Sequence, residues 1–116
     1  MDKITVYEKP TCTTCRKVLK ILIENGVDFE KINYYIEPFK KSQLQSLMSK
    51  MKMKPSEILR AKEEIYKKLK IKEKNFSEDE ILELMIKHPD LVQRPIVEKG
   101  NKAILARPPE KINELF

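Results

Sequence analysis

The hydrophobic pattern changes its period twice within the first 34 residues. Apolar and polar residues alternate over residues 3–8, which predicts a β-strand. Apolar positions at helical spacing then fill residues 13–25, and Gly26 supplies a C-terminal stop. Residues 29–34 predict a second short strand. A strand, helix and strand this close together predict a parallel pair with a right-handed crossover.

Helical spacing dominates the middle of the chain, from about residue 38 to residue 88. The first helix has an apolar stripe, which we interpret as core packing: Leu44, Leu47, Met48 and Met51. Short helices are expected over residues 55–59, opened by Pro55, and over 65–69. Ser77 and Glu80 form a capping box for a further helix that ends at His88-Pro89. We expect a helical insertion here and not a separate domain.

The last segment predicts a β-hairpin and a short helix. Residues 96–98 and 103–106 flank the turn Lys99-Gly100-Asn101-Lys102, and Pro108-Pro109 opens a helix that carries Ile112, Leu115 and Phe116. The whole order resembles an α/β fold, the thioredoxin-like mixed β-sheet, with an insertion at about 38–88 between its β-α-β and β-β-α halves. Residues 1–116 then form one domain. In that architecture a cis-proline before the third strand faces the thiol, and Pro95 occupies this place.

Charge changes this picture little. The net charge is +6, from 24 basic and 18 acidic residues, which invites a nucleic-acid partner. Lysines recur beside glutamates along the expected helices, so we interpret them as solvated helix faces and expect no nucleic acid. Neither a secretory signal nor a membrane span is visible, which predicts a cytoplasmic protein. Only four basic residues are arginines, the type that offers a planar, multi-donor fork: Arg16, Arg60, Arg94 and Arg107.

The only two cysteines, Cys12 and Cys15, stand at CxxC spacing at the start of the first expected helix. Unpaired N–H groups of a first helical turn favour a nearby thiolate, so Cys12 is the candidate nucleophile. A zinc site competes poorly with this interpretation, because zinc takes four ligands and the chain has one histidine, His88. Two inert packed thiols are the other alternative. Strand, CxxC and helix in this order favour a redox site.

Several motifs in order resemble one family, the arsenate reductases that work with glutathione and glutaredoxin, which also includes the Spx-type regulators of RNA polymerase. The resemblance extends over essentially the whole chain. It rests on Pro10-Thr11-Cys12 with Arg16, Leu59-Arg60-Ala61-Lys62, Phe76-Ser77-Glu78-Asp79, His88-Pro89, Arg94-Pro95-Ile96-Val97 and Arg107-Pro108-Pro109-Glu110.

The resemblance implies that the Cys12 thiolate attacks a small oxyanion such as arsenate and that Arg60, Arg94 and Arg107, together with Arg16, bind it. Guanidinium forks and helix N–H groups would hold the oxygens of a tetrahedral anion and neutralise charge that repels the thiolate. The implied reductant is glutathione with glutaredoxin, or thioredoxin. No bound cofactor and no metal are expected.

Two positions depart from the reductase pattern. Cys15 replaces a small hydroxyl residue and could capture an oxidised Cys12 internally. Glu8 replaces a histidine that helps to ionise the thiol, and a charged carboxylate close by would oppose ionisation. His88 is interpreted as a helix-end residue and not as a catalytic base.

Three functions remain open at this point. A thiol-dependent reductase is the leading hypothesis, because the closing motif Arg107-Pro108-Pro109-Glu110 belongs to the reductase side of the family. A redox-switch regulator of the Spx type that binds RNA polymerase is the alternative, which Cys12-Thr13-Thr14-Cys15 favours. A general thiol-disulfide oxidoreductase lies between them.

Overall fold

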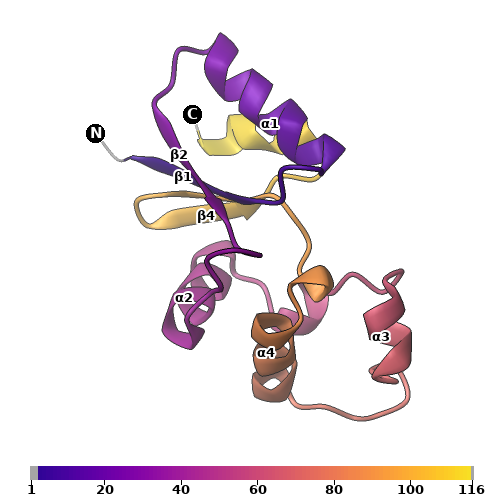
Figure 1. The fold of residues 1–116 in the computed structure, drawn as a ribbon. Coiled ribbons are helices and arrows are strands. Elements are labelled where there is room, and N and C mark those ends of the chain that lie inside the picture. Colours follow the sequence, from indigo (N-terminus) through magenta and orange to yellow (C-terminus); the bar gives the residue numbers. More distant parts are fainter. Residues whose placement is uncertain (1–2, 116) are drawn as a thin grey trace. The chain divides into compact units, whose positions relative to one another are not determined.

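A four-stranded mixed sheet forms the framework of the N- and C-terminal parts of the chain, in a computed structural model that describes residues 3–115. The strands are β1 (Ile4–Glu8), β2 (Phe29–Asn33), β3 (Ile96–Lys99) and β4 (Lys102–Leu105), in the order β2-β1-β3-β4 (Figure 1). β1 pairs parallel with β2 and antiparallel with β3, and β3 and β4 form the hairpin. The predicted parallel pair and hairpin are confirmed, with the turn shortened to Gly100-Asn101.

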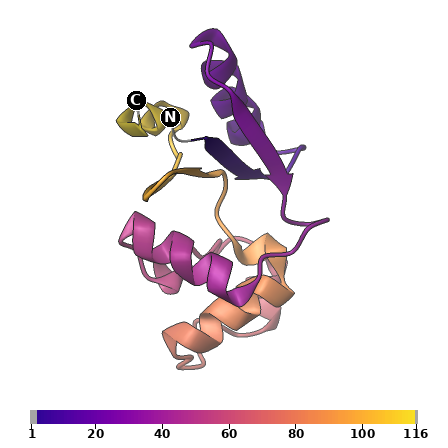
Figure 2. The same ribbon diagram turned by 90° about the vertical axis from the view of Figure 1, so that its left-hand side faces the viewer.

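One face of this sheet carries two helices. Helix α1 (Thr13–Glu24) joins β1 to β2 and ends one residue before the predicted end, with Asn25 as its C-cap and Gly26 at φ 65°. The 3-10 helix η3 (Pro109–Leu115) packs beside α1 on the same face (Figure 2). The predicted final helix is therefore present but opens at Pro109, and Phe116 lies outside the described residues.

The alternation of side chains along β1 determines which of its residues pack in the core between the sheet and α1. Ile4 and Val6 point to the same face of the strand and join Val18 and Leu22 of α1 in one buried cluster. The remaining buried members come from the hairpin and the C-terminal segment: Val97, Ala106, Ile112 and Leu115. Glu8, two residues after Val6, continues the same face of the strand to its carboxyl end.

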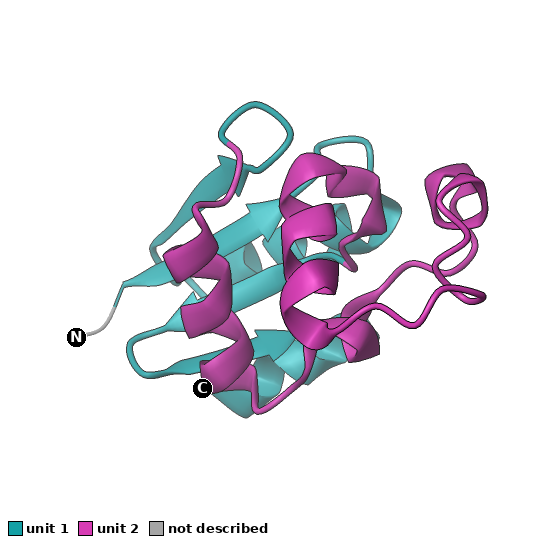
Figure 3. Ribbon diagram, turned by 90° about the horizontal axis from the view of Figure 1, so that it is seen from below, with its two compact units in different colours: residues 1–37, 94–116 teal, residues 38–93 magenta. Residues whose placement is uncertain are grey.

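The chain divides into two compact units (Figure 3). We call residues 1–37 with 94–116 the sheet unit and residues 38–93 the helical unit. The helical unit begins where the predicted insertion begins. It continues past residue 88 to Gln93, because the chain after α4 pairs within this unit, with a bridge between Leu59 and Val92.

The helical unit contains five helical segments, of which the hydrophobic spacing predicts the first four and misses the short η2. They are α2 (Lys41–Met51), η1 (Pro55–Ile58), α3 (Glu64–Lys68), α4 (Glu78–Lys87) and η2 (Pro89–Leu91). The predicted capping box opens α4: the Glu80 N–H donates to Ser77 Oγ over 3.2 Å, and the Ser77 N–H donates to Glu80 Oε1 over 3.0 Å. None of the helices among residues 3–115 is long and apolar enough to cross a membrane.

We expect the cluster under α1 to carry much of the stability of the sheet unit. Leu22→Ala should lower the free energy of unfolding by about 2–5 kcal/mol, because Leu22 is fully buried and the truncation leaves a cavity. Ile23→Ala is the matched control on the same helix, since Ile23 is 66% exposed, and should cost less than about 0.5 kcal/mol. Urea denaturation measures both. Equal losses in the two variants would contradict this assignment of the core.

Candidate active site

Cys12 occupies the N-cap of α1. Its backbone is extended, with φ −79° and ψ 123°, and its own N–H donates to the Lys9 carbonyl over 2.9 Å. The Cys12 Sγ accepts the backbone N–H of Cys15 at 3.4 Å. The sulfur therefore lies where the first turn of a 12-residue helix offers unpaired N–H groups, a position that favours negative charge.

The two thiols differ in burial and in acidity. Both are free, but Cys12 is partly exposed and Cys15 is fully buried. Burial alone would raise the pKa of Cys12, but the thiol and N–H of Cys15 and the charge of Arg94 outweigh it and lower that pKa. Burial, followed by the hydrogen bond to Cys12, raises the pKa of Cys15 to about 12. Cys12 is thus the thiol that ionises first.

Arg94 supplies the positive charge beside Cys12. Its side chain is almost entirely buried, with 7% of the residue exposed, and its Nη1 donates to the Tyr35 hydroxyl over 3.4 Å. Within residues 3–115 the Arg94 Nε has no hydrogen-bond partner, although it is buried. A buried donor without a partner is costly, so this guanidinium is equipped to bind an anion that arrives at Cys12.

Two tyrosines and a lysine line the same region, and the sequence analysis missed all three. The rings of Tyr34 and Tyr35 lie 5.1 Å apart, and the Lys9 ammonium lies 4.8 Å from the centre of the Tyr35 ring. Their position could have been found from topology. The carboxyl ends of parallel strands share one edge of a sheet, and Glu8 pairs with Asn33 immediately before the two tyrosines.

The other predicted arginines have different neighbours. Arg107 is exposed, and its Nη1 donates to the backbone carbonyl of Arg94 over 3.0 Å. Arg16 is exposed and donates from Nη2 to the Thr11 carbonyl over 3.3 Å. Arg60 belongs to the helical unit, where its Nε lies 3.0 Å from Glu63 Oε1. The sheet unit therefore brings Arg94 to Cys12 and attaches Arg107 to the backbone of Arg94.

The remaining predicted positions are also described. The Arg94–Pro95 peptide bond is cis, and so is Arg107–Pro108. His88 is the C-cap of α4 and donates its N–H to the Leu84 carbonyl over 2.7 Å, which is the helix-end position expected from the sequence. The carboxylate of Glu8, with 4% of the residue exposed, acts on Cys15 and raises its pKa.

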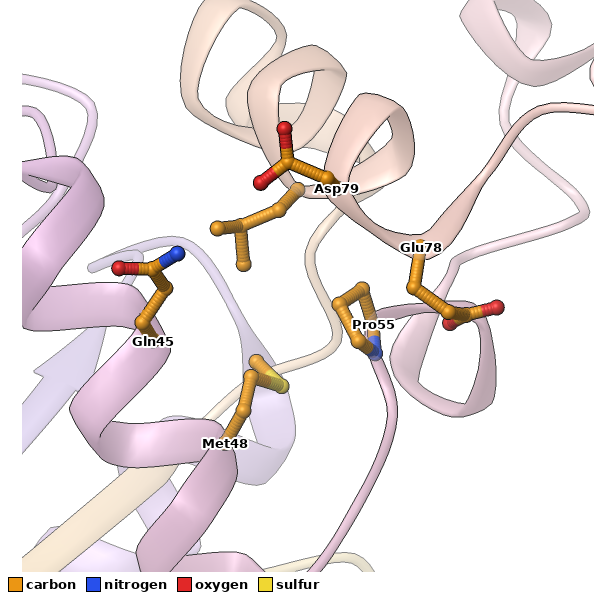
Figure 4. A pocket seen from close by; sticks show the side chains of 6 residues that line it. Gln45, Met48, Pro55, Glu78 and Asp79 are labelled. Carbon is orange, nitrogen blue, oxygen red and sulfur yellow. The ribbon is translucent and has the colours of Figure 1, made fainter.

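A surface pocket lies in the helical unit between α2, η1 and α4 (Figure 4). Its lining residues are Gln45, Met48, Pro55, Glu78, Asp79 and Leu82. This lining contains neither a thiol nor a cationic group, so it lacks the chemistry described around Cys12. Among residues 3–115 no three His, Cys, Asp or Glu side chains are grouped so that they could hold a metal ion.

The fold and the thiol pair define a class of protein, and comparisons with known proteins agree on it. The chain is an arsenate reductase-like thiol oxidoreductase with a thioredoxin-like fold. The model of the ArsC family matches residues 7–115, so the chain belongs to the ArsC family. The resemblance inferred from the sequence motifs is confirmed.

Two relatives and one solved structure illustrate the similarity. The chain is 34% identical over 114 residues to the uncharacterized protein YfgD of Escherichia coli (strain K12), covering 97% of this chain and 96% of that protein. It is 32% identical over 116 residues to the arsenate reductase of the same strain, covering 100% of this chain and 82% of that protein. The structure of arsenate reductase from Vibrio cholerae superposes with a TM-score of 0.93 at 29% identity, covering 99% of this chain and 98% of that one.

The acidity of Cys12 can be measured by alkylation. The rate of reaction with iodoacetamide should follow thiolate formation at a pKa below the ordinary 9.0. Arg94→Gln should slow alkylation at pH 7 by on the order of tenfold, because it removes the neighbouring positive charge. Lys20→Gln, on the exposed side of α1, is the control and should react like the unchanged protein. An Arg94→Gln protein that reacts at the unchanged rate would contradict the assignment.

The burial of Glu8 predicts a pH-dependent stability. Burial raises the pKa of Glu8, while Lys31 opposes the effect. Because the folded pKa exceeds the unfolded value, protonated Glu8 stabilises the fold below pH 4.5, and this stability is lost as the pH rises through the folded pKa. Glu8→Gln should therefore raise the melting temperature at pH 7 by a few degrees, because it removes the cost of burying a charged carboxylate.

The gain from Glu8→Gln should disappear near pH 4, where wild-type Glu8 is itself protonated. Glu30→Gln is the control, since Glu30 forms an exposed ion pair with Lys3 at 3.1 Å. Calorimetric melting at both pH values measures the difference. A gain that is the same at pH 4 and pH 7 would show that burial of the charge is not its cause.

Proposed function

We propose that this protein reduces a small tetrahedral oxyanion of the arsenate class through Cys12. The observation that carries the proposal is the pairing of a partly exposed thiol of lowered pKa with a buried guanidinium whose Nε has no partner in the described chain. An oxyanion at this place would complete the hydrogen bonding of Arg94 and receive the N–H groups of the first turn of α1. The names of the relatives agree with this substrate class.

In the first step the Cys12 thiolate attacks the arsenic atom of arsenate. A sulfur–arsenic bond forms, and one arsenate oxygen takes up protons and leaves as water. The arsenic stays in its +5 state. Arg94 assists by neutralising oxyanion charge that would otherwise repel the thiolate, and the helix N–H groups assist in the same way.

In the second step a further thiol attacks the Cys12 sulfur. A disulfide bond forms, the sulfur–arsenic bond breaks, and its electron pair stays on arsenic, which leaves as arsenite in the +3 state. The attacking thiol is Cys15 or a glutathione. Glutaredoxin or thioredoxin then reduces the disulfide, and its own two thiols are oxidised.

The other arginines have graded roles in this proposal. Arg107 fixes the backbone of Arg94, Arg16 supports the loop that precedes Cys12, and Arg60 remains a predicted anion ligand from the resemblance. The dithiol state on which the reaction depends persists in a reducing compartment, which favours the cytoplasm.

Turnover with arsenate tests the proposal. Purified protein with arsenate, glutathione and glutaredoxin should consume NADPH through glutathione reductase, and Cys12→Ser should abolish this activity. Arg94→Gln should lower kcat/KM by about 10²–10³-fold, the usual cost of losing an oxyanion donor. Lys20→Gln should retain the full rate. Absence of turnover with both glutaredoxin and thioredoxin would overturn the proposal.

A general thiol-disulfide oxidoreductase is the second candidate, favoured by the closeness of Cys12 Sγ to the Cys15 backbone at 3.4 Å. Insulin reduction separates the two functions. A rate that survives replacement of Arg60, Arg94 and Arg107 by alanine would identify disulfide exchange, since this reaction needs no oxyanion ligands.

A further inference from the structure

Two periodicities bring Glu8 and Cys15 together in the sheet unit. Ile4, Val6 and Glu8 share one face of β1, and Cys15, Val18 and Leu22 are the buried positions of α1. The four apolar residues of these six belong to one buried cluster, and Glu8 and Cys15 are not among its members. α1 runs back along β1 (Figure 1), so the carboxyl end of the strand is level with the first helical turn. The Glu8 charge accordingly acts on the Cys15 thiol.

Burial supports this placement. Glu8 is 4% exposed and Cys15 is fully buried. The backbone N–H of Lys9, the residue after Glu8, donates to the Cys15 sulfur, and the Glu8 charge acts on the same thiol. The Glu8 carboxylate at the end of β1 and the Cys15 thiol in the first turn of α1 are thus both shielded from solvent.

A buried Cys15 must lose its proton before or during an attack on a disulfide, and Glu8 is a base that could accept this proton. A thiolate, and not a thiol, attacks a disulfide. Even when Cys12 is modified and no longer acts on Cys15, burial and the Glu8 charge keep the pKa of Cys15 raised, so few Cys15 thiols are ionised at pH 7. Removal of the proton during the attack avoids this penalty, and it needs a base within the buried site.

We propose that Glu8 accepts the proton of Cys15 while Cys15 attacks a Cys12 that carries glutathione in a mixed disulfide. The Cys15 Sγ–Cys12 Sγ bond forms, and the bond between Cys12 and the glutathione sulfur breaks. Glutathione leaves with the electron pair as a thiolate, so its sulfur is reduced while that of Cys15 is oxidised. The proposal rests on the proposed function insofar as Cys12 is the modified thiol.

The charged groups around Glu8 are compatible with a base. Lys31, on the neighbouring strand β2, opposes the effect of burial and favours the ionised carboxylate. From α1 the facing titratable group is Cys15, which in turn interacts with Cys12 at the N-cap. On the other side β3 begins with the apolar Ile96 and Val97, while the charge of Arg94 acts on Tyr34, Tyr35 and Cys12.

The charged residues of η3, the helix that packs on α1, are all exposed: Glu110, Lys111 and Glu114. η3 contributes the buried apolar side chains Ile112 and Leu115. The described groups that act with Glu8 are therefore one cation on β2 and the Cys15 thiol of α1.

Glu8→Gln tests the proposal in the full chain, because it keeps the shape of the side chain and removes the base. The protein is treated with glutathione disulfide to modify Cys12, and the release of glutathione is followed by mass spectrometry from pH 5 to pH 10. At pH 7 the variant should release glutathione at least about tenfold more slowly than the unchanged protein. Toward pH 10 the difference between the two rates should narrow, because a growing fraction of Cys15 then ionises without a base.

Three controls make the result specific. Cys15→Ser should retain the glutathione, and Glu30→Gln, an exposed carboxylate on β2, should release it at the unchanged rate. The alkylation rate of Cys12 in Glu8→Gln should stay within about twofold, since the main causes of the lowered pKa of Cys12 are Cys15 and Arg94. This last control also shows that the variant is folded.

Several outcomes would overturn the proposal. They are an unchanged rate in Glu8→Gln at pH 7, a rate that is lowered equally at every pH, and an unchanged protein that keeps its glutathione without forming the Cys12–Cys15 disulfide. Arsenate takes no part in this experiment. A failure of arsenate turnover with normal glutathione release would therefore remove the proposed function and leave the role of Glu8 intact.

Discussion

The site depends on one constraint: α1 must begin where β1 has just ended. The hydrogen bond from the Cys12 N–H to the Lys9 carbonyl closes the turn between them, and the residue that caps the helix then carries the sulfur. A sulfur at that place faces backbone N–H groups without partners in the helix. The core beneath α1 holds the helix in register with the strand, since Val6 and Val18 belong to the same cluster. Packing and reactivity are therefore consequences of the same connection.

The sequence predicted the parts of the structure whose cause is local. Alternation revealed β1, helical spacing revealed α1, and the Ser77–Glu80 capping box opened α4 as expected, because each pattern is satisfied within a few residues. The boundaries of helices and strands were less predictable, because individual backbone hydrogen bonds determine them. The hairpin strands each extend by one residue into the expected turn, at Lys99 and Lys102.

The candidate site was predictable in its chemistry but not in its arrangement. Four arginines stood out by residue type alone, yet only their tertiary neighbours separate Arg94, buried beside Cys12, from Arg107, which holds the Arg94 carbonyl. Tyr34 and Tyr35 look like the end of an ordinary strand until β2 is paired with β1. Glu8 was expected to oppose ionisation of the nucleophile. In the structure the Glu8 charge acts on Cys15, because strand alternation places Glu8 on the face of the sheet that α1 covers.

The unequal thiols give the proposed reaction an order. While Cys12 is a free thiolate, its charge and its hydrogen bond with Cys15 both contribute to the raised pKa of Cys15. A bond to an oxyanion or to glutathione removes that charge, so these two contributions end and only burial and Glu8 still oppose ionisation. Cys15 thus becomes easier to deprotonate at the moment when its attack is required. Before that moment the same interactions keep it protonated, which leaves the Cys12 thiolate to react with the incoming substrate first.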